Sequence, residues 1–89
     1  MYDNVENFRE YLKDTSYVNN GVQHVYAFPN GYGASVVKHD FSYGGKNGLW
    51  ELAVLNGEDL CYTSGITEDV IGHLSWTKVE AVLRDIKQL

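Results

Sequence analysis

The chain has 89 residues, enough for one domain, and we expect residues 1–89 to form a single domain. Its 44 % hydrophobic and 21 % charged residues are typical of a globular protein. Seven basic against twelve acidic residues give a formal net charge of −5, which argues against direct binding to nucleic acid.

Cysteine usage and hydropathy point to the cytoplasm. Cys61 is the single cysteine, so an internal disulfide is excluded and a reducing compartment is favoured. The amino terminus is too charged for the core of a signal peptide, and no apolar run approaches the roughly 18 residues of a membrane span. We therefore expect no contact with a membrane.

Residues 3–14 are predicted to form a helix. Val5, Phe8 and Leu12 recur at spacings that place them on one helical face. Asp3 begins a stretch with the spacing of a capping box. The run Asn19-Asn20-Gly21 then predicts a turn.

The period of the hydrophobic pattern then changes to two, which predicts strands. Pro29-Asn30-Gly31 and Asn56-Gly57 are hairpin signals between them, and residues 42–48 read as a glycine-rich loop. The predicted strands are residues 22–28, 32–39, 49–55 and 60–63.

The last third of the chain predicts helices. A helical turn is expected from Thr67, interrupted by Gly72, and Ser75 is expected to cap a final helix. That helix has an apolar stripe made of Val79, Val82, Leu83 and Ile86. The chain therefore predicts an α+β fold: a small antiparallel four-stranded sheet (a meander) with an N-terminal helix and C-terminal helices packed on one face.

The stretch FPNGYGASVV, residues 28–37, raises the question of a phosphate-binding loop. Such a loop must enter a helix, whereas Gly33 is followed by residues that favour a strand. A hairpin with Asn30 and Gly31 at positive φ is favoured, with Gly33 at a bulge or a close backbone approach. A plain loop is likewise favoured for Gly44-Gly45-Lys46.

No set of residues in the sequence indicates a catalytic, metal or cofactor site. The three histidines and Cys61 match no zinc-ligand spacing. The acidic pairs Glu58-Asp59 and Glu68-Asp69 are adjacent in sequence, so their side chains point apart. We expect no enzyme activity, no cofactor and no metal.

Surface recognition is the remaining class of function. Aromatic side chains gather in the predicted sheet and its connecting loop, and these residue types are frequent hot spots of protein interfaces. They serve equally well to complete the core of a small domain, and the sequence does not choose between these uses. The candidate protein-binding residues are Tyr26, Tyr32, Tyr43, Lys46, Trp50 and Tyr62.

Four blocks of the sequence resemble a family of short bacteriophage-encoded proteins that has no assigned activity. These blocks are NGYGASVV (30–37), YGG (43–45), GLWELAVL (48–55) and IT-x-DVIG-x-L (66–74). The chain departs from the family pattern at Lys46-Asn47, where its relatives tend to carry Pro and Glu.

The resemblance implies a small non-enzymatic phage accessory protein in the cytoplasm of a bacterial host. We expect it to bind a host or phage protein and to inhibit or redirect a host complex, such as a defence complex. The alternatives are a small-ligand or nucleotide-binding module that uses the glycine-rich loops, and a minor structural virion protein. A chain this short also gains stability by pairing with another chain, so a homodimer is a further expectation.

Overall fold

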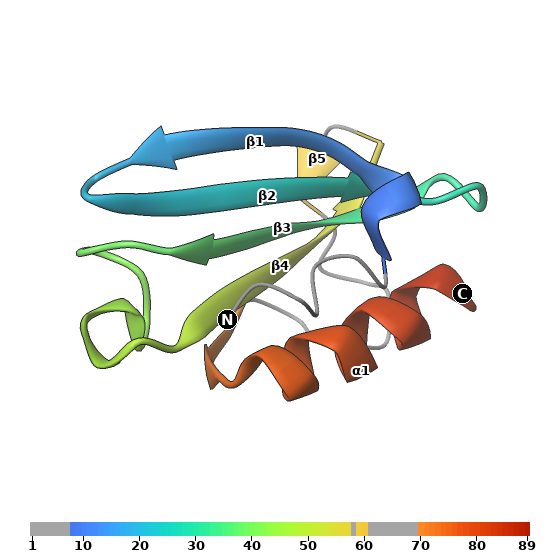
Figure 1. Ribbon diagram of the computed structural model, residues 1–89. Coiled ribbons are helices and arrows are strands. Elements are labelled where there is room, and N and C mark those ends of the chain that lie inside the picture. The colour runs from blue at the N-terminus through green and yellow to red at the C-terminus, as the bar shows by residue number, and fades with distance from the viewer. Residues whose placement is uncertain (1–7, 58, 61–69) are drawn as a thin grey trace.

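The computed structural model describes residues 8–57, 59–60 and 70–89 of the chain. In this part, six strands form one sheet and an α-helix packs across one face of it (Figure 1). The elements are β1 (Leu12–Val18), β2 (Gly21–Ala27), β3 (Tyr32–Lys38), the 3-10 helix η2 (Gly45–Asn47), β4 (Trp50–Asn56), β5 (Asp59–Leu60), β6 (Ile71–Leu74) and α1 (Trp76–Lys87).

The sheet is an antiparallel meander, as predicted. Strands β1 to β4 are neighbours in chain order, and each consecutive pair is antiparallel. Two short strands share the far side of β4: β5 pairs with its last residues and β6 with its first. The predicted strands 22–28, 32–39 and 49–55 correspond to β2, β3 and β4, whereas residues 61–63 of the fourth lie outside the described part.

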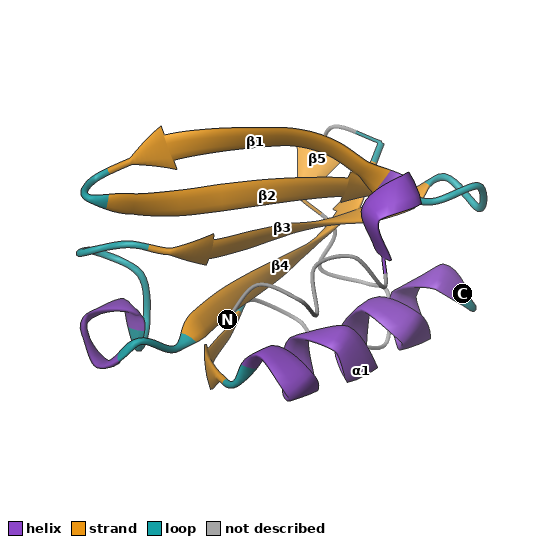
Figure 2. Ribbon diagram, viewed as in Figure 1, coloured by secondary structure: helices purple, strands orange, loops and turns teal. Residues whose placement is uncertain are grey.

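The predicted N-terminal helix is wrong where the structure describes it. Residues 8–11 form a single 3-10 turn and residues 12–18 form β1 (Figure 2). Asn19 and Asn20 adopt φ values of 48° and 64°, which make a two-residue hairpin turn and set Val18 opposite Gly21. The strand-favouring Thr15-to-Val18 segment therefore pairs with β2, and this pairing overrides a short helical periodicity.

A second correction concerns residues 71–74, which form β6 rather than part of an interrupted helix. Residues 67–69, where that helical turn was expected to start, lie outside the described part. Gly72 lies so close to Tyr43 that an added Cβ would come 2.4 Å from the Tyr43 Cβ atom. The His73 N–H donates to the Tyr43 carbonyl at 3.1 Å. Gly72 therefore serves a close contact with the β3–β4 loop.

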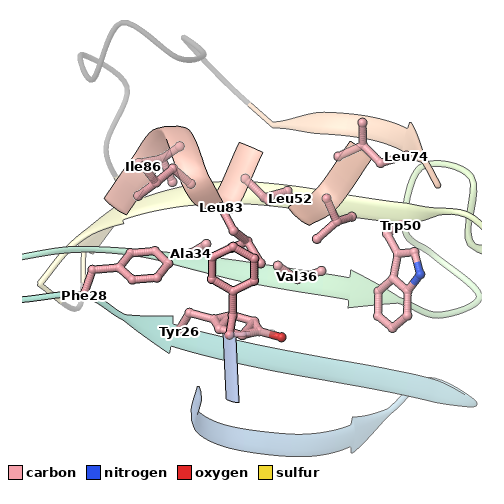
Figure 3. Close-up of a cluster of buried hydrophobic side chains, with 12 residues drawn as sticks. Tyr26, Phe28, Ala34, Val36, Trp50, Leu52, Leu74, Leu83 and Ile86 are labelled. Atoms are coloured by element: carbon pink, nitrogen blue, oxygen red, sulfur yellow. The ribbon is translucent and has the colours of Figure 1, made fainter. Parts of the chain in front are cut away.

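The final helix begins as predicted. The Ser75 hydroxyl accepts a hydrogen bond from the Lys78 N–H at 3.4 Å and caps α1. Of the predicted stripe, Val79, Leu83 and Ile86 have no exposed surface, and Val82 is partly buried. The stripe packs on side chains of one sheet face, drawn in Figure 3, which include Ala34, Val36, Leu52 and Val54.

The stretch FPNGYGASVV forms the hairpin between β2 and β3. The Phe28 N–H donates to the Tyr32 carbonyl at 2.8 Å, and the Gly31 N–H donates to the Phe28 carbonyl at 3.1 Å. Gly31 has φ 89°, whereas Asn30 does not have the positive φ that was expected of it. The turn thus needs one left-handed residue, and glycine provides it.

Gly33 marks a close approach of two backbones, one of its two predicted roles. A Cβ atom at this position would lie 2.2 Å from the Tyr26 carbonyl oxygen. The neighbouring backbone belongs to the centre of the sheet, so it has little freedom to move away.

Asn30 joins this hairpin to the end of α1. Its side-chain Nδ2 lies 2.8 Å from the Ile86 carbonyl oxygen and 3.1 Å from that of Lys87. Its Oδ1 accepts from the Tyr32 N–H at 2.9 Å. The last carbonyls of a helix lack hydrogen-bond partners within the helix. The Asn30 side chain thus supplies a donor to these carbonyls and an acceptor to the N–H group of the turn.

Substitutions at Gly33 and Gly31 should separate steric overlap from backbone strain. We expect Gly33→Ala to lower the free energy of unfolding by about 1–3 kcal/mol or more, the usual cost of overpacking. Gly31→Ala should cost only about 1–2 kcal/mol, because its added Cβ meets nothing within 4 Å and only the positive φ is unfavourable. Urea unfolding of both variants gives the comparison, and an equal or smaller loss at Gly33 would contradict it.

Substitution of Asn30 should loosen the contact between hairpin and helix. We expect Asn30→Ala to lower the free energy of unfolding by about 1–2 kcal/mol through its lost hydrogen bonds. Asn30→Asp should cost more, because a carboxylate would face the negative end of the helix. Urea denaturation measures both losses, with Gln88→Ala at the same helix end as the control. An Asn30→Asp protein as stable as the wild type would refute this role.

Candidate functional site

The structure places the predicted binding residues in different environments. Tyr26 and Trp50 are only 1 % and 4 % exposed and belong to the core. Tyr32 is partly buried against the same core, whereas Tyr43 is 62 % exposed and Lys46 is exposed in η2. Tyr62 lies outside the described residues. The sequence left open whether these aromatic residues form an interface or complete the core, and Tyr26 and Trp50 complete the core.

An aromatic cluster lies between the sheet and the start of α1. The Trp50 and Trp76 ring centroids are 4.9 Å apart, and the His24 ring lies 5.7 Å from Trp50 and 6.2 Å from Trp76. The Lys38 ammonium lies 4.7 Å from the Trp50 ring centroid, within the range of a cation–π contact. Trp50 thus contacts two aromatic rings and one cation, which gives it a structural role.

Burial changes the acid–base properties of this cluster. It lowers the pKa of His24 below its usual 6.5, since the charged ring would lose its hydration. Burial, together with the nearby Glu80 carboxylate, raises the pKa of Tyr26 to about 12. The Thr15 hydroxyl lies 3.0 Å from His24 Nδ1, whereas His24 Nε2 and the Tyr26 hydroxyl have no hydrogen-bond partner among the described residues. Both groups are therefore neutral in the folded protein at pH 7.

The exposed aromatic residues lie at one end of the sheet. Phe41 and Tyr43 are 78 % and 62 % exposed and belong to the loop between β3 and β4, and Tyr17 is 83 % exposed near the end of β1. We call residues 39–49, which carry Phe41, Tyr43 and Lys46, the aromatic loop. In Figure 1 this loop and the β1–β2 turn occupy the same end of the molecule.

Hydrogen bonds hold the aromatic loop in place at several points. The Asp40 N–H donates to the Asn19 carbonyl at 3.1 Å, and Asn20 Nδ2 donates to the Asp40 carboxylate at 2.9 Å. Further along, the Tyr43 N–H donates to Glu51 Oε1 at 2.8 Å. The loop is therefore tied to the β1–β2 turn on one side and to β4 on the other.

Additional hydrogen bonds fold the beginning of the aromatic loop on itself. The Ser42 hydroxyl accepts from the His39 N–H at 2.9 Å and donates to the His39 carbonyl at 3.0 Å. The Phe41 N–H donates to His39 Nδ1 at 3.1 Å. Phe41 is thus presented to solvent from a backbone that is itself well bonded.

The glycine-rich segments do not form a joint phosphate site. Gly31–Gly33 and Gly44–Lys46 lie at opposite ends of β3. In the second segment, the Gly45 N–H donates to the Ser42 carbonyl, and the Asn47 and Leu49 N–H groups donate to the Gly44 carbonyl. These three amides are hydrogen-bonded within the loop, whereas a nucleotide-binding loop points its amides at the phosphate.

An open hollow of about 600 Å³ lies between the β1–β2 turn and the aromatic loop. Tyr17, Asn20 and Val22 line one side, and His39 and Asp40 line the other. Within the described residues, no group of three His, Cys, Asp or Glu side chains is placed to hold a metal ion. The residues that line the hollow are thus polar, aromatic and aliphatic, with no metal-binding group among those described.

Comparisons with protein-family models, with curated proteins and with solved structures gave no match to this chain. None of the helices in the described part has the length and apolar character needed to cross a membrane.

Sequence reasoning found part of the exposed aromatic set and missed the rest. Tyr43 and Lys46 were among the candidate protein-binding residues, and both are exposed in the loop between β3 and β4. Phe41 and Tyr17 were missed, although both are more exposed than Tyr43. The alternation of Thr15 and Tyr17 before Asn19-Asn20 was the available signal, but this segment was read as the turn that follows the predicted helix of residues 3–14.

The lowered pKa of His24 predicts that stability depends on pH. The unfolded chain takes up a proton near pH 6.5, while folded His24 stays neutral to lower pH. The stabilisation is thus complete above pH 6.5 and is lost as the pH falls through the folded pKa. We expect the free energy of unfolding to fall between pH 7 and pH 5, and His24→Phe to show a smaller fall.

Urea unfolding at several pH values measures this dependence, and NMR titration of the His24 ring gives the folded pKa directly. A His24 ring that is half-protonated at or above pH 6.5 in the folded protein would show that the aromatic cluster does not disfavour its charge.

Proposed function

We propose that this protein acts by binding another protein through the aromatic loop. The observation that supports this proposal is the pair of large aromatic side chains, Phe41 and Tyr43, that extend into solvent from a loop fixed by hydrogen bonds. Aromatic residues supply much of the binding energy of protein interfaces. Exposing two of them close together in sequence is costly for a domain this small unless a partner covers them.

The arrangement of the loop also lowers the cost of binding. A flexible loop must lose conformational freedom when a partner binds, and this loss weakens the complex. Here the bonds from Asp40 to Asn19 and from Tyr43 to Glu51 already hold the loop. Lys46, exposed in the same loop, adds a cation to the rim of the surface.

The proposed setting follows from the resemblance to short phage proteins. In this proposal the protein works in the cytoplasm of a bacterial host, where it binds a host or phage protein without catalysing a reaction. Inhibition or redirection of a host complex, such as a defence complex, is the proposed consequence.

Removal of the two loop aromatics should abolish partner binding and leave the fold intact. We expect Phe41→Ala/Tyr43→Ala to weaken the complex by about 2 kcal/mol or more, roughly 30-fold in Kd, if these are interface hot spots. Quantitative affinity purification from infected host cells, followed by titration of the captured protein, measures the loss.

Leu89→Ala provides the matched control, because Leu89 is also an exposed apolar residue but lies at the end of α1. The control should capture the same protein as the wild type. A captured protein that binds the double variant and the wild type equally well would place the interface elsewhere.

A further inference from the structure

Strand β1 forms one edge of the sheet. Among the described residues it pairs only with β2, and within that part of the chain no strand lies along its other side. Val18 and Gly21 flank the two-residue turn, and residues in that position exchange both of their backbone hydrogen bonds. Hydrogen-bonded and non-hydrogen-bonded pairs alternate along two antiparallel strands. Val18 and Ser16 therefore bond to β2, and the backbone N–H and C=O groups of Thr15 and Tyr17 point towards the free edge.

The two halves of this edge differ in their protection against pairing. Natural sheets block their edges with charges and bulges. The first half of β1 has both, since Lys13 and Asp14 are exposed and the register shifts between Leu12 and Asp14. The second half, residues 15–18, has no charge, contains the strand-favouring residues Thr, Tyr and Val, and includes the 83 % exposed Tyr17.

We propose that the second half of β1 pairs with the same segment of a second copy of this chain. The two strands run antiparallel about a twofold axis at Ser16, perpendicular to the sheet. Thr15 then lies opposite the second copy's Tyr17, so the outward backbone groups of the two residues meet. Both sheets continue across the contact with their helices on the same side.

The sequence of β1 suits a twofold axis at Ser16 better than one at Asp14 or at Thr15. In an antiparallel pair of strands, residues that lie opposite each other point to the same face of the sheet. The twofold axis must therefore pass through a residue that lies opposite its own copy, and not between two residues. An axis at Asp14 would oppose two carboxylates directly, and an axis at Thr15 would bring the bulge at Lys13 against Tyr17. With the axis at Ser16, Asp14 lies opposite Val18, and the two Asp14 residues are about 13 Å apart at 3.3–3.4 Å per residue.

The contact is small, so the dimer should be weak and depend on concentration. The twofold axis directs the two aromatic loops towards opposite ends of the dimer and leaves both accessible. A dimer therefore presents two copies of the proposed protein-binding surface, which would increase avidity for a partner with repeated sites. The pairing itself does not rest on the function proposed for the aromatic loop.

Sedimentation equilibrium over a range of concentrations tests the proposal. We expect the average mass of the wild type to rise from 10.1 kDa towards twice that value. Tyr17→Pro should remain at the monomer mass, because proline removes an N–H that points to the free edge and is tolerated on edge strands. Phe41→Ala/Tyr43→Ala should dimerise as the wild type does, which separates this proposal from the function of the aromatic loop.

Disulfide trapping tests the register without depending on a proline variant. In a Cys61→Ser background, Ser16→Cys places two thiols on the twofold axis, in a pair that does not exchange hydrogen bonds and suits a disulfide. Asp14→Cys is the matched control on the same strand. We expect Ser16→Cys to form the covalent dimer at least about tenfold faster, as its thiols have the higher effective concentration.

Three results would overturn the proposal: a wild type that stays monomeric at all concentrations, a Tyr17→Pro protein that dimerises unchanged, or equal rates of trapping at positions 14 and 16. A monomeric wild type whose captured partner is lost in Tyr17→Pro would assign the edge to a different protein and would also overturn pairing between copies.

Discussion

The packing of α1 on β3 and β4 is the interaction on which the rest of the structure depends. Val79, Leu83 and Ile86 have no exposed surface, and the opposing Ala34 and Val36 are equally buried. Ala34 and Val36 belong to the same cluster of buried side chains as Leu83 and Ile86 (Figure 3). In a domain of this size the apolar stripe of one helix supplies a large share of the buried area, so the sheet is stable only with the helix in place.

This packing covers one face of the sheet and fixes where the other parts of the molecule lie. Asn30 holds the β2–β3 hairpin to the end of α1, so this end of the sheet is occupied by the helix. The opposite end carries the aromatic loop, and β1 lies at the edge farthest from β4. On the face away from the helix, Gln23 donates to the Ser35 hydroxyl at 2.8 Å, as expected of a sheet face that meets water.

The local patterns of the sequence predicted much of the fold, and their failures have a common cause. Ser75 as a helix cap, the apolar stripe of α1 and the hairpin at residues 28–31 all depend on neighbours in sequence, and all were predicted. Strand β6 was missed because its residues pair with β4, about twenty residues earlier in the chain. Strand β1 was missed because the helical spacing of Val5, Phe8 and Leu12 was extended to residue 14, whereas residues 12–18 pair with β2 across a two-residue turn. For the candidate site, the glycine-rich composition of residues 42–48 was enough to place Tyr43 and Lys46 in a loop, but the burial of Tyr26 and Trp50 could not be predicted.

The stretch FPNGYGASVV shows what the sequence determined by itself. Its turn residues and the strand-favouring residues after Gly33 were enough to favour a hairpin over a phosphate loop, because turn geometry depends on a few adjacent residues. Only the tertiary structure decided that Gly33 lies against the Tyr26 carbonyl and that Asn30 reaches the end of α1. Such contacts join residues far apart in the chain, and exposure is likewise set by what the rest of the fold places beside each side chain.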